Sequence, residues 1–398
     1  MSGPKVISQN LEKRLLHALF FIFGFGVMAW VPRFPELKAS LHLSNGAFGT
    51  ILTTGSIGAM VSLLTIGQIV HNLGLFRVAV SSVTFLFLSL LGAIHVHSPL
   101  AFTFFNMGVG FGIMAVHVCI NTQGFQIQER SKENVVTSAS GFWSAGALST
   151  AIVSGLLIGH IDLMHHLDFT SITCGVAMVA IFIRLRPVLV KAKAHSDIQY
   201  SVKDIFTSFH LDWPVSIGMA SAIFLEASVG DWGTIFTRER LNVTSGLSAV
   251  PYVAFTLCMI IGRLRVHTLL PRYTLRDLSK EATILAGLGF GIPIIIATHL
   301  PTSLKTISYI LFIIGFALGG LGSSFLAPSF TSAANRRSPH PSSVVVGQFG
   351  VMNNLLTNSL KLIVAGVIGL TGSIALALMI PAALMFIAYS FTKVFEGQ

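Results

Sequence analysis

The sequence predicts an all-α polytopic membrane protein with twelve transmembrane helices, arranged as two pseudo-symmetric bundles of six. Three observations lead to this prediction: the apolar composition, the spacing of long apolar segments and the distribution of basic residues. Of the 398 residues, 53% are hydrophobic and only 10% are charged. Soluble globular proteins usually contain about 25% charged residues. Most of this chain is therefore expected to face lipid or other apolar helices.

Twelve segments are long and apolar enough to cross a bilayer, which requires roughly 20 residues per helix. They lie near 14–33, 46–70, 76–95, 99–127, 135–159, 168–184, 214–236, 246–264, 278–298, 304–328, 343–368 and 372–392. The only long hydrophilic connection separates the first six from the last six. The predicted organisation is therefore an N-terminal bundle (1–186), a cytoplasmic linker (187–212) and a C-terminal bundle (213–398).

Lysine and arginine gather on one side of the predicted membrane, and this side is usually the cytoplasm. With the N-terminus inside, nineteen of the 25 basic residues fall in cytoplasmic segments, five fall outside, and Lys361 lies within a span. Both termini are therefore predicted to be cytoplasmic. The same bias accounts for the net charge of +10. Because no basic patch contains interleaved aromatic residues, a nucleic-acid partner is not expected.

The sequence contains no pattern typical of a cofactor site or an active site. Gly108-x-Gly110-x-Gly112 and Gly315-x-x-x-Gly319 lie inside apolar spans with no strand before them, which favours close helix packing over nucleotide binding. The three cysteines are far apart and lack metal-ligand spacing. The histidines and aspartates within 160–168 are more typical of a solvated loop than of a metal site. We expect no cofactor, no metal and no enzymatic activity.

The two halves of the chain resemble each other, which indicates an internal duplication. The first predicted span ends with Trp30-x-x-x-Phe34 and the seventh with Trp232-x-x-x-Phe236. A short polar segment follows each of them, and Ser44 or Thr244 is placed to cap the next helix. Six-plus-six duplication is a common origin of membrane transporters.

Several motifs along the chain match those of a known family. They are Trp30-x-Pro32-Arg33 with Leu43-Ser44, Asn121-x-Gln123, Ser144-x-Gly146-Ala147-Leu148, Glu226-Ala227 with Asp231-Trp232, and Gly262-Arg263-Leu264. On these motifs the chain resembles the major facilitator superfamily over essentially its whole length, and within it a bacterial branch related to fucose permease. The resemblance implies a monomeric secondary transporter of the bacterial inner membrane that moves a small solute by alternating access.

The loop between the second and third spans departs from the pattern of that superfamily. Gly67, Gly74 and Arg77 are present, but His71 and Asn72 occupy the positions where an acid and a base are usual. The resemblance implies a gating role for the three retained residues. The two departures leave open an alternative, in which the protein is a receptor or scaffold on a transporter fold that no longer cycles.

Two acidic residues, Glu226 and Asp231, lie within an apolar span. Counted from Pro214 at 1.5 Å per residue, Glu226 lies about 18 Å along the helix and Asp231 about 25 Å. An ionisable group at such a depth is costly unless it is paired or protonated, so it indicates a function. We expect both to take part in proton coupling. The alternatives are a structural hydrogen bond for Glu226 and an ion pair with Arg33 for Asp231.

Polar and aromatic side chains within the spans are the candidate solute-binding residues. They are Trp30, His117, Asn121, Gln123, Trp143, Asn353, Asn354 and Asn358. Asn354 and Asn358 are four residues apart and share one helix face, as expected of a strip that binds a sugar-like solute. Packing between helices is the alternative for the asparagines and the aromatic residues, and a buried core position is the alternative for His117.

Basic residues inside or beside the spans are the candidate gating residues. Lys361 lies about 25 Å along its span, where it can pair with Asp231, bind an anionic group or extend to the interface. Arg33 and Arg263 complete this group. The sequence thus predicts a proton-coupled transporter of a small polar solute, and a sugar-like solute is favoured. Proton-driven efflux of drugs or other apolar compounds is the alternative within the same class.

Overall fold

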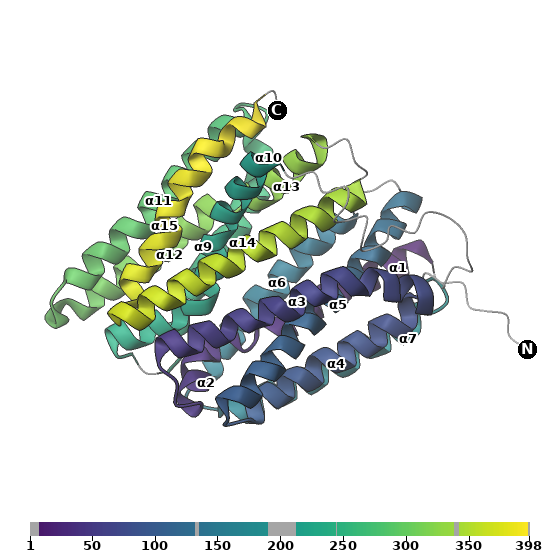
Figure 1. Ribbon diagram of the computed structural model, residues 1–398, viewed down its shortest axis with the longest axis horizontal. Helices are drawn as coiled ribbons and strands as arrows, with labels where there is room; N and C mark the ends of the chain where they lie inside the picture. Colours follow the sequence, from purple (N-terminus) through teal and green to yellow (C-terminus); the bar gives the residue numbers. More distant parts are fainter. Residues whose placement is uncertain (1–7, 132–134, 190–211, 244, 338–341, 397–398) are drawn as a thin grey trace, which may run out of the picture. The chain divides into compact units, whose positions relative to one another are not determined.

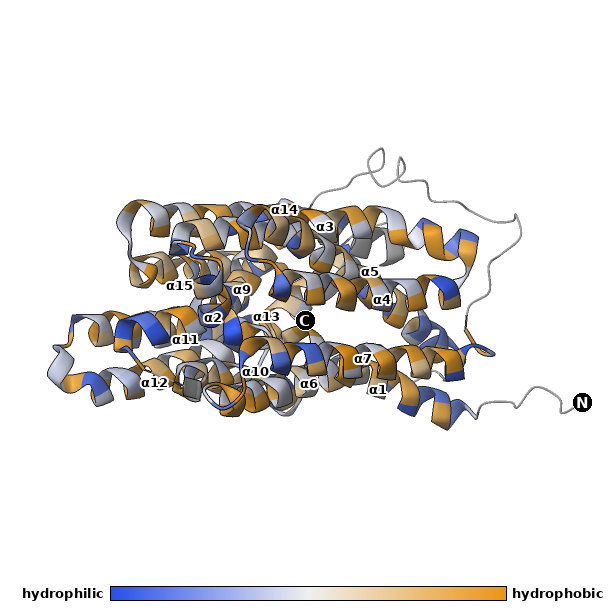
Figure 2. Ribbon diagram, turned by 90° about the horizontal axis from the view of Figure 1, so that it is seen from below, coloured by the Kyte–Doolittle hydropathy of each residue, from blue (hydrophilic) through white to orange (hydrophobic). Residues whose placement is uncertain are grey.

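The computed structural model describes residues 8–131, 135–189, 212–243, 245–337 and 342–396 of the chain. Within these ranges, twelve helices are long and apolar enough to cross a membrane. Each overlaps one of the predicted segments, so the prediction of an all-α polytopic membrane protein is confirmed. Figure 2 shows apolar residues along the helices and hydrophilic residues at their ends. Most of the predicted linker lies outside the described residues.

The helices form two compact units (Figure 1). The first comprises Met1–Trp30, Thr54–Val153 and Ile161–Val202, and the second comprises Val31–Thr53, Ser154–His160 and Lys203–Gln398. Two short segments from the first half of the sequence therefore belong to the second unit. The predicted division into an N-terminal bundle (1–186), a linker (187–212) and a C-terminal bundle (213–398) follows the sequence and stays a prediction.

The first unit is built from long helices around a core of aliphatic side chains and several phenylalanines. They are α1 (Gln9–Met28), the part of α3 (Asn45–Leu73) that follows Thr53, α4 (Leu75–His95), α5 (Pro99–Ser131), most of α6 (Val135–Leu157) and α7 (Leu163–Leu185). Helix α4 packs against α5 and α7, and it lies beside α7 in Figure 1. A Cβ on Gly110 would lie 1.8 Å from the carbonyl oxygen of Gly55, which confirms close helix packing at this glycine motif.

The second unit is arranged around α9, which contacts α10, α12, α13, α14 and α15. Its elements are η1 (Val31–Arg33), α2 (Phe34–Ser40), the start of α3, α9 (Trp213–Leu241), η2 (Ser245–Ala249), α10 (Val250–Leu269), α11 (Leu275–His299), η3 (Thr302–Leu304), α12 (Lys305–Ser323), α13 (Leu326–Arg337), α14 (Ser342–Thr371), α15 (Ile374–Phe391) and η4 (Thr392–Phe395). Helices α11, α12 and α15 lie side by side (Figure 1).

The helix ends follow from local side chains. Ser44 accepts a hydrogen bond from the backbone N–H of Ala47 at 3.3 Å, which confirms its predicted role at the start of α3. Pro214 lies in the first turn of α9, as predicted, and Asp212 accepts from the N–H of Val215. Thr244 lies outside the described residues.

The tenth span contains a short interruption. Helix α12 ends at Ser323 and α13 begins at Leu326, and Ser324 and Phe325 form a turn between them. A break inside an apolar span exposes backbone groups that need other partners. One of these partners is a charged residue of the candidate site.

Candidate functional site

The first predicted acid, Glu226 on α9, forms an ion pair with Arg263 on α10. The carboxylate oxygen lies 3.4 Å from the guanidinium, and the two side chains are 30% and 31% exposed. Arg263 also donates through Nε to the carbonyl oxygen of Ser324 at 2.8 Å. That carbonyl lies at the break between α12 and α13. Arg263 therefore links the acid of α9 to the interruption of the tenth span.

The second predicted acid, Asp231, forms an ion pair with Lys361 of α14 at 2.8 Å. Both side chains are about one-fifth exposed, at 18% and 20%. Of the three roles considered for Lys361, this geometry favours pairing with Asp231. Arg33 pairs instead with Glu36, at 2.8 Å, and its side chain is fully buried. The two acids of α9 thus reach different neighbouring helices, as expected for residues five positions apart.

Open space lies on α9 between the two acids. A Cβ built on Gly230 would meet no atom within 4 Å, whereas at Gly233 it would lie 2.8 Å from the ring of Phe316. Gly230 is one turn after Glu226 and directly precedes Asp231. The side of α9 at Gly230 therefore leaves room for another molecule.

A polar strip on α14 continues from Lys361 and comprises Asn353, Asn354, Thr357 and Asn358. With 3.6 residues per turn, all four lie within about 80° of the direction of Lys361. Three of their oxygen atoms, Oδ1 of Asn353, Oγ1 of Thr357 and Oδ1 of Asn358, are buried and have no hydrogen-bond partner within the described ranges. Buried acceptors are almost always satisfied in folded proteins. In this structure the three oxygens therefore lack the hydrogen-bond partner that such groups usually have.

The candidate solute-binding residues of the first unit do not form one strip like that of α14. Asn121 donates to the carbonyl oxygen of His117 in its own helix at 2.8 Å. His117 is exposed on α5 and its ring centroid lies 6.5 Å from that of Phe23. Trp143 is half-buried, whereas Trp30 is 7% exposed. Solute binding by these residues stays a prediction.

Gln123 belongs to a buried polar cluster that sequence reasoning missed. Its amide donates to Glu12 at 2.6 Å, and Arg130 donates to the same oxygen at 2.7 Å. Glu12 is only 2% exposed although it lies in the first turn of α1. The available signal was an acid and a base at the ends of two predicted spans on the same side of the membrane. This geometry favours a structural role for Gln123.

We expect Glu12→Ala to destabilise the first unit, because it leaves the amide of Gln123 and the charge of Arg130 without their acceptor. The loss should be about 1–3 kcal/mol, the usual cost of a buried polar group that loses its partner. Thermal unfolding in detergent measures it, with Glu129→Ala as the matched control, since Glu129 is exposed on α5. Equal melting temperatures for the two variants would contradict the structural role.

The three predicted gating residues near the connection of α3 and α4 have different surroundings: Gly67 lies in α3, Gly74 between the helices and Arg77 in α4. Gly74 has φ of 81° and directly precedes α4, a backbone conformation that favours glycine. Gly67 has open space around it, and Arg77 is exposed. Gly74 therefore has a conformational reason to be glycine. A gating role for all three stays a prediction.

A second polar cluster joins the C-terminal end of α9 to segment 31–53, inside the second unit. Glu239 pairs with Lys38 and accepts from Asn45 at 2.7 Å. Beside it the backbone of Gly46 approaches Gly369 so closely that a Cβ would lie 2.8 Å from its Cα. The start of α3 is therefore packed closely against α14. Sequence reasoning placed these charges in loops and therefore missed the cluster.

The comparisons with known proteins agree with this architecture. A family model described as the Major Facilitator Superfamily matches residues 16–359. An uncharacterised transporter of that type from Yersinia pestis is 26% identical over 345 residues, covering 85% of this chain and 84% of the relative. Membrane protein MosC of Rhizobium meliloti is 26% identical over 320 residues, covering 79% of this chain and 73% of the relative.

Two solved structures have the same fold at low sequence identity. The nucleoside transporter NupG matches with a TM-score of 0.75 and 16% identity, covering 97% of this chain and 100% of that chain. A D-xylose–proton symporter matches with a TM-score of 0.70 and 12% identity, covering 98% of each chain. Such a likeness shows the fold and leaves the solute to be inferred from the site.

Proposed function

The chain belongs to the major facilitator superfamily of membrane transporters, and we propose that it moves a small, polar, sugar-like solute by proton-coupled alternating access. A particular likeness to fucose permease stays a prediction. We further propose that the protein works as a monomer in the bacterial inner membrane, with both termini in the cytoplasm. The bias of lysine and arginine supports this orientation.

The three unpartnered oxygens of α14 are the observation that supports this solute class most directly. Asn353, Thr357 and Asn358 present acceptors, and an unmade hydrogen bond at a buried group costs about 1–3 kcal/mol. A solute with several hydroxyl or N–H donors satisfies them, whereas an apolar drug does not. Nucleosides and D-xylose, the solutes named for the two transporters of the same fold, both contain several hydroxyl groups.

The pair of Glu226 and Arg263 supports proton coupling. When Glu226 is ionised, it holds one side of Arg263, which also binds the carbonyl of Ser324 at the break of the tenth span. Protonation removes the negative charge and frees the guanidinium, because a neutral acid no longer forms an ion pair. A proton on α9 then changes the contacts of Arg263 on α10 with both α9 and the break of the tenth span, as a coupling group must do.

The cluster of Lys38, Asn45 and Glu239, inside the second unit, supports a gate on the outer side of the membrane. In the proposed orientation, the C-terminal end of α9 and the start of α3 face the periplasm. Their contact joins parts of the chain from before and after the linker. We propose that these contacts form the outer gate and separate when the transporter opens outward.

A solute-induced current in proteoliposomes tests the proposal. Purified protein on a solid-supported membrane is exposed to a panel of sugars, nucleosides, amino acids, organic acids and apolar drugs. A proton current with one class of polar solute supports the proposal. A response to drugs alone favours the efflux alternative. Specific binding of one compound with no flux in counterflow assays favours a receptor that no longer cycles.

Replacement of one strip residue distinguishes polar from apolar cargo. We expect Asn358→Ala to raise KM for the solute about three- to tenfold with little change in kcat, since one hydrogen bond contributes about 0.5–1.5 kcal/mol. Concentration-dependent uptake measures it. Ser359→Ala is the matched control, because Ser359 bonds only to Leu355 of its own helix among the contacts described. An unchanged KM in Asn358→Ala would contradict solute binding by the strip.

A further inference from the structure

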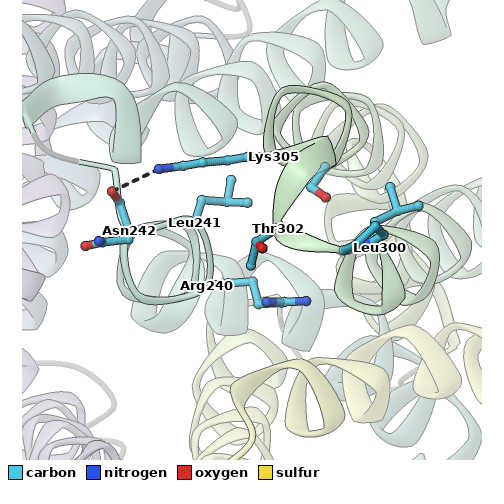
Figure 3. A pocket seen from close by; sticks show the side chains of 8 residues that line it. Arg240, Leu241, Asn242, Leu300, Thr302 and Lys305 are labelled. Atoms are coloured by element: carbon cyan, nitrogen blue, oxygen red, sulfur yellow. Dashed lines mark hydrogen bonds between the residues drawn. The ribbon is translucent and has the colours of Figure 1, made fainter.

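A cavity apart from the candidate site lies at one end of the second unit. It has a volume of about 250 Å³ and is lined by residues from the end of α9, the end of α11, η3 and the start of α12. Figure 3 shows Arg240 and Lys305 reaching toward its edges from α9 and α12, with Thr302 between them. The lining contains two cationic residues and no acidic residue.

Both cationic residues are bound to the protein through backbone carbonyls. Arg240 donates to the carbonyl oxygen of Thr298 near the end of α11, and Lys305 donates to that of Asn242 at 3.1 Å, just after α9. Such contacts are favourable because helix C-termini attract cations. Each of these contacts uses one N–H donor of the side chain, whereas an arginine side chain has five donors and a lysine side chain has three. Neither charge has an ion-pair partner within the described residues, so both retain donors and positive charge.

Thr302 also lines the cavity, and its hydroxyl group lies between the two cationic side chains (Figure 3). A hydroxyl group can donate a hydrogen bond to an anion. Two cationic side chains and one hydroxyl group therefore surround this small space.

The sequence gives an independent reason to expect a function here. Only five of the 25 basic residues lie on the predicted outer side, where lysine and arginine are normally avoided. Arg240 and Lys305 are two of the five, and they line the same cavity although 65 residues separate them. The gathering of these two outer basic residues around one cavity is consistent with a site for an anion.

We propose that this cavity binds a small anionic group, a phosphate or a carboxylate. Ligand pockets for drug-sized molecules usually exceed about 300 Å³, so the cavity fits one such group rather than a whole nucleoside or disaccharide. At about 30 Å³ per water molecule, it has room for the anion and several waters. The anion belongs either to a lipid headgroup at the outer interface or to a soluble compound.

Thermal unfolding of the full-length protein in neutral detergent tests the proposal and separates the two sources. Inorganic phosphate and acetate are titrated in one series. Phosphatidylglycerol is titrated in the other, with phosphatidylcholine as its neutral reference. The variants are Arg240→Gln, Lys305→Gln, the double variant and Arg240→Lys, which keeps the charge. Arg265→Gln is the control, because Arg265 is exposed on α10 and does not line the cavity.

We expect saturable stabilisation of the wild type, and an apparent affinity that falls about tenfold in each single Gln variant, equivalent to ~1.4 kcal/mol. Arg240→Lys should retain most of the response and Arg265→Gln all of it. Stabilisation by phosphate or acetate identifies a soluble anion, whereas stabilisation by phosphatidylglycerol alone identifies a lipid headgroup. No stabilisation of the wild type, or an equal response in the double variant, would overturn the proposal. Neither result depends on the transported solute, so this test is separate from that of the proposed function.

Discussion

Glu226→Gln is expected to abolish proton-driven accumulation of the solute while leaving exchange of solute for solute intact. The glutamine keeps the size and the hydrogen-bonding oxygen of the side chain, but it can neither release a proton nor form the ion pair with Arg263. One charge moved through 100 mV contributes about 2.3 kcal/mol, which sustains an accumulation of about 50-fold. Without coupling, the ratio of inside to outside solute falls to one.

Two measurements on the same proteoliposomes check this result. Accumulation under an imposed proton gradient reports coupling, and counterflow without a gradient reports the conformational cycle. Glu281→Gln is the matched control, because Glu281 is exposed at the start of α11. Accumulation by Glu226→Gln equal to the wild type would contradict the coupling role. Loss of both activities together would indicate that Glu226 is needed for solute binding or for folding, and thermal unfolding separates these two.

The break of the tenth span gives this prediction a structural consequence. Arg263 binds both Glu226 and the carbonyl of Ser324, so loss of the acid should also loosen α13 relative to α12. Hydrogen exchange of the backbone near Ser324 should therefore be faster in Glu226→Gln. In Glu281→Gln it should match the wild type.

Most of the fold followed from the sequence because the bilayer imposes a simple rule. A spanning helix must be long and apolar, so composition alone located the twelve spans to within a few residues at most ends. The interruptions were harder to predict. Pro32 and Pro35 mark the break between α1 and α2. The break at Ser324 and Phe325 precedes Pro328, which lacks the N–H that would bond to the carbonyl of Ser324 in a continuous helix. Pro293 and Pro381 lie inside continuous helices, so a proline in the sequence does not by itself predict a break.

The two acids of the site were predictable for a related reason, since an ionisable residue in an apolar span is rare and costly. Their partners were harder to assign. Arg263 was identified through the family motif and Lys361 as a misplaced charge, yet helix periodicity says nothing about which helices are neighbours. Glu12 and Glu239 were missed because acids at span ends are normally hydrated. Here tertiary packing buries Glu12 and joins Glu239 to residues from the other half of the sequence.

Asp231→Ala is expected to lower the transport rate at least tenfold, because it leaves Lys361 in an apolar environment without its counter-charge. Removing one partner of a fully buried pair costs about 3–5 kcal/mol, and the partial exposure of this pair reduces the expected value to about 1–3 kcal/mol. The charge-reversed double variant, Asp231→Lys with Lys361→Asp, should recover much of the loss because the attraction is restored.

A double-mutant cycle with Asp231→Ala, Lys361→Ala and both together measures the pair directly, by thermal unfolding and by initial uptake rate. Residues in direct contact usually show coupling energies of about 0.5–3 kcal/mol. If Lys361 binds an anionic part of the solute instead, Lys361→Ala raises KM while Asp231→Ala leaves it unchanged. If Lys361 only extends to the interface, the two substitutions are additive. A coupling energy in the usual range, together with recovery in the reversed pair, would establish that Lys361 acts through its ion pair with Asp231.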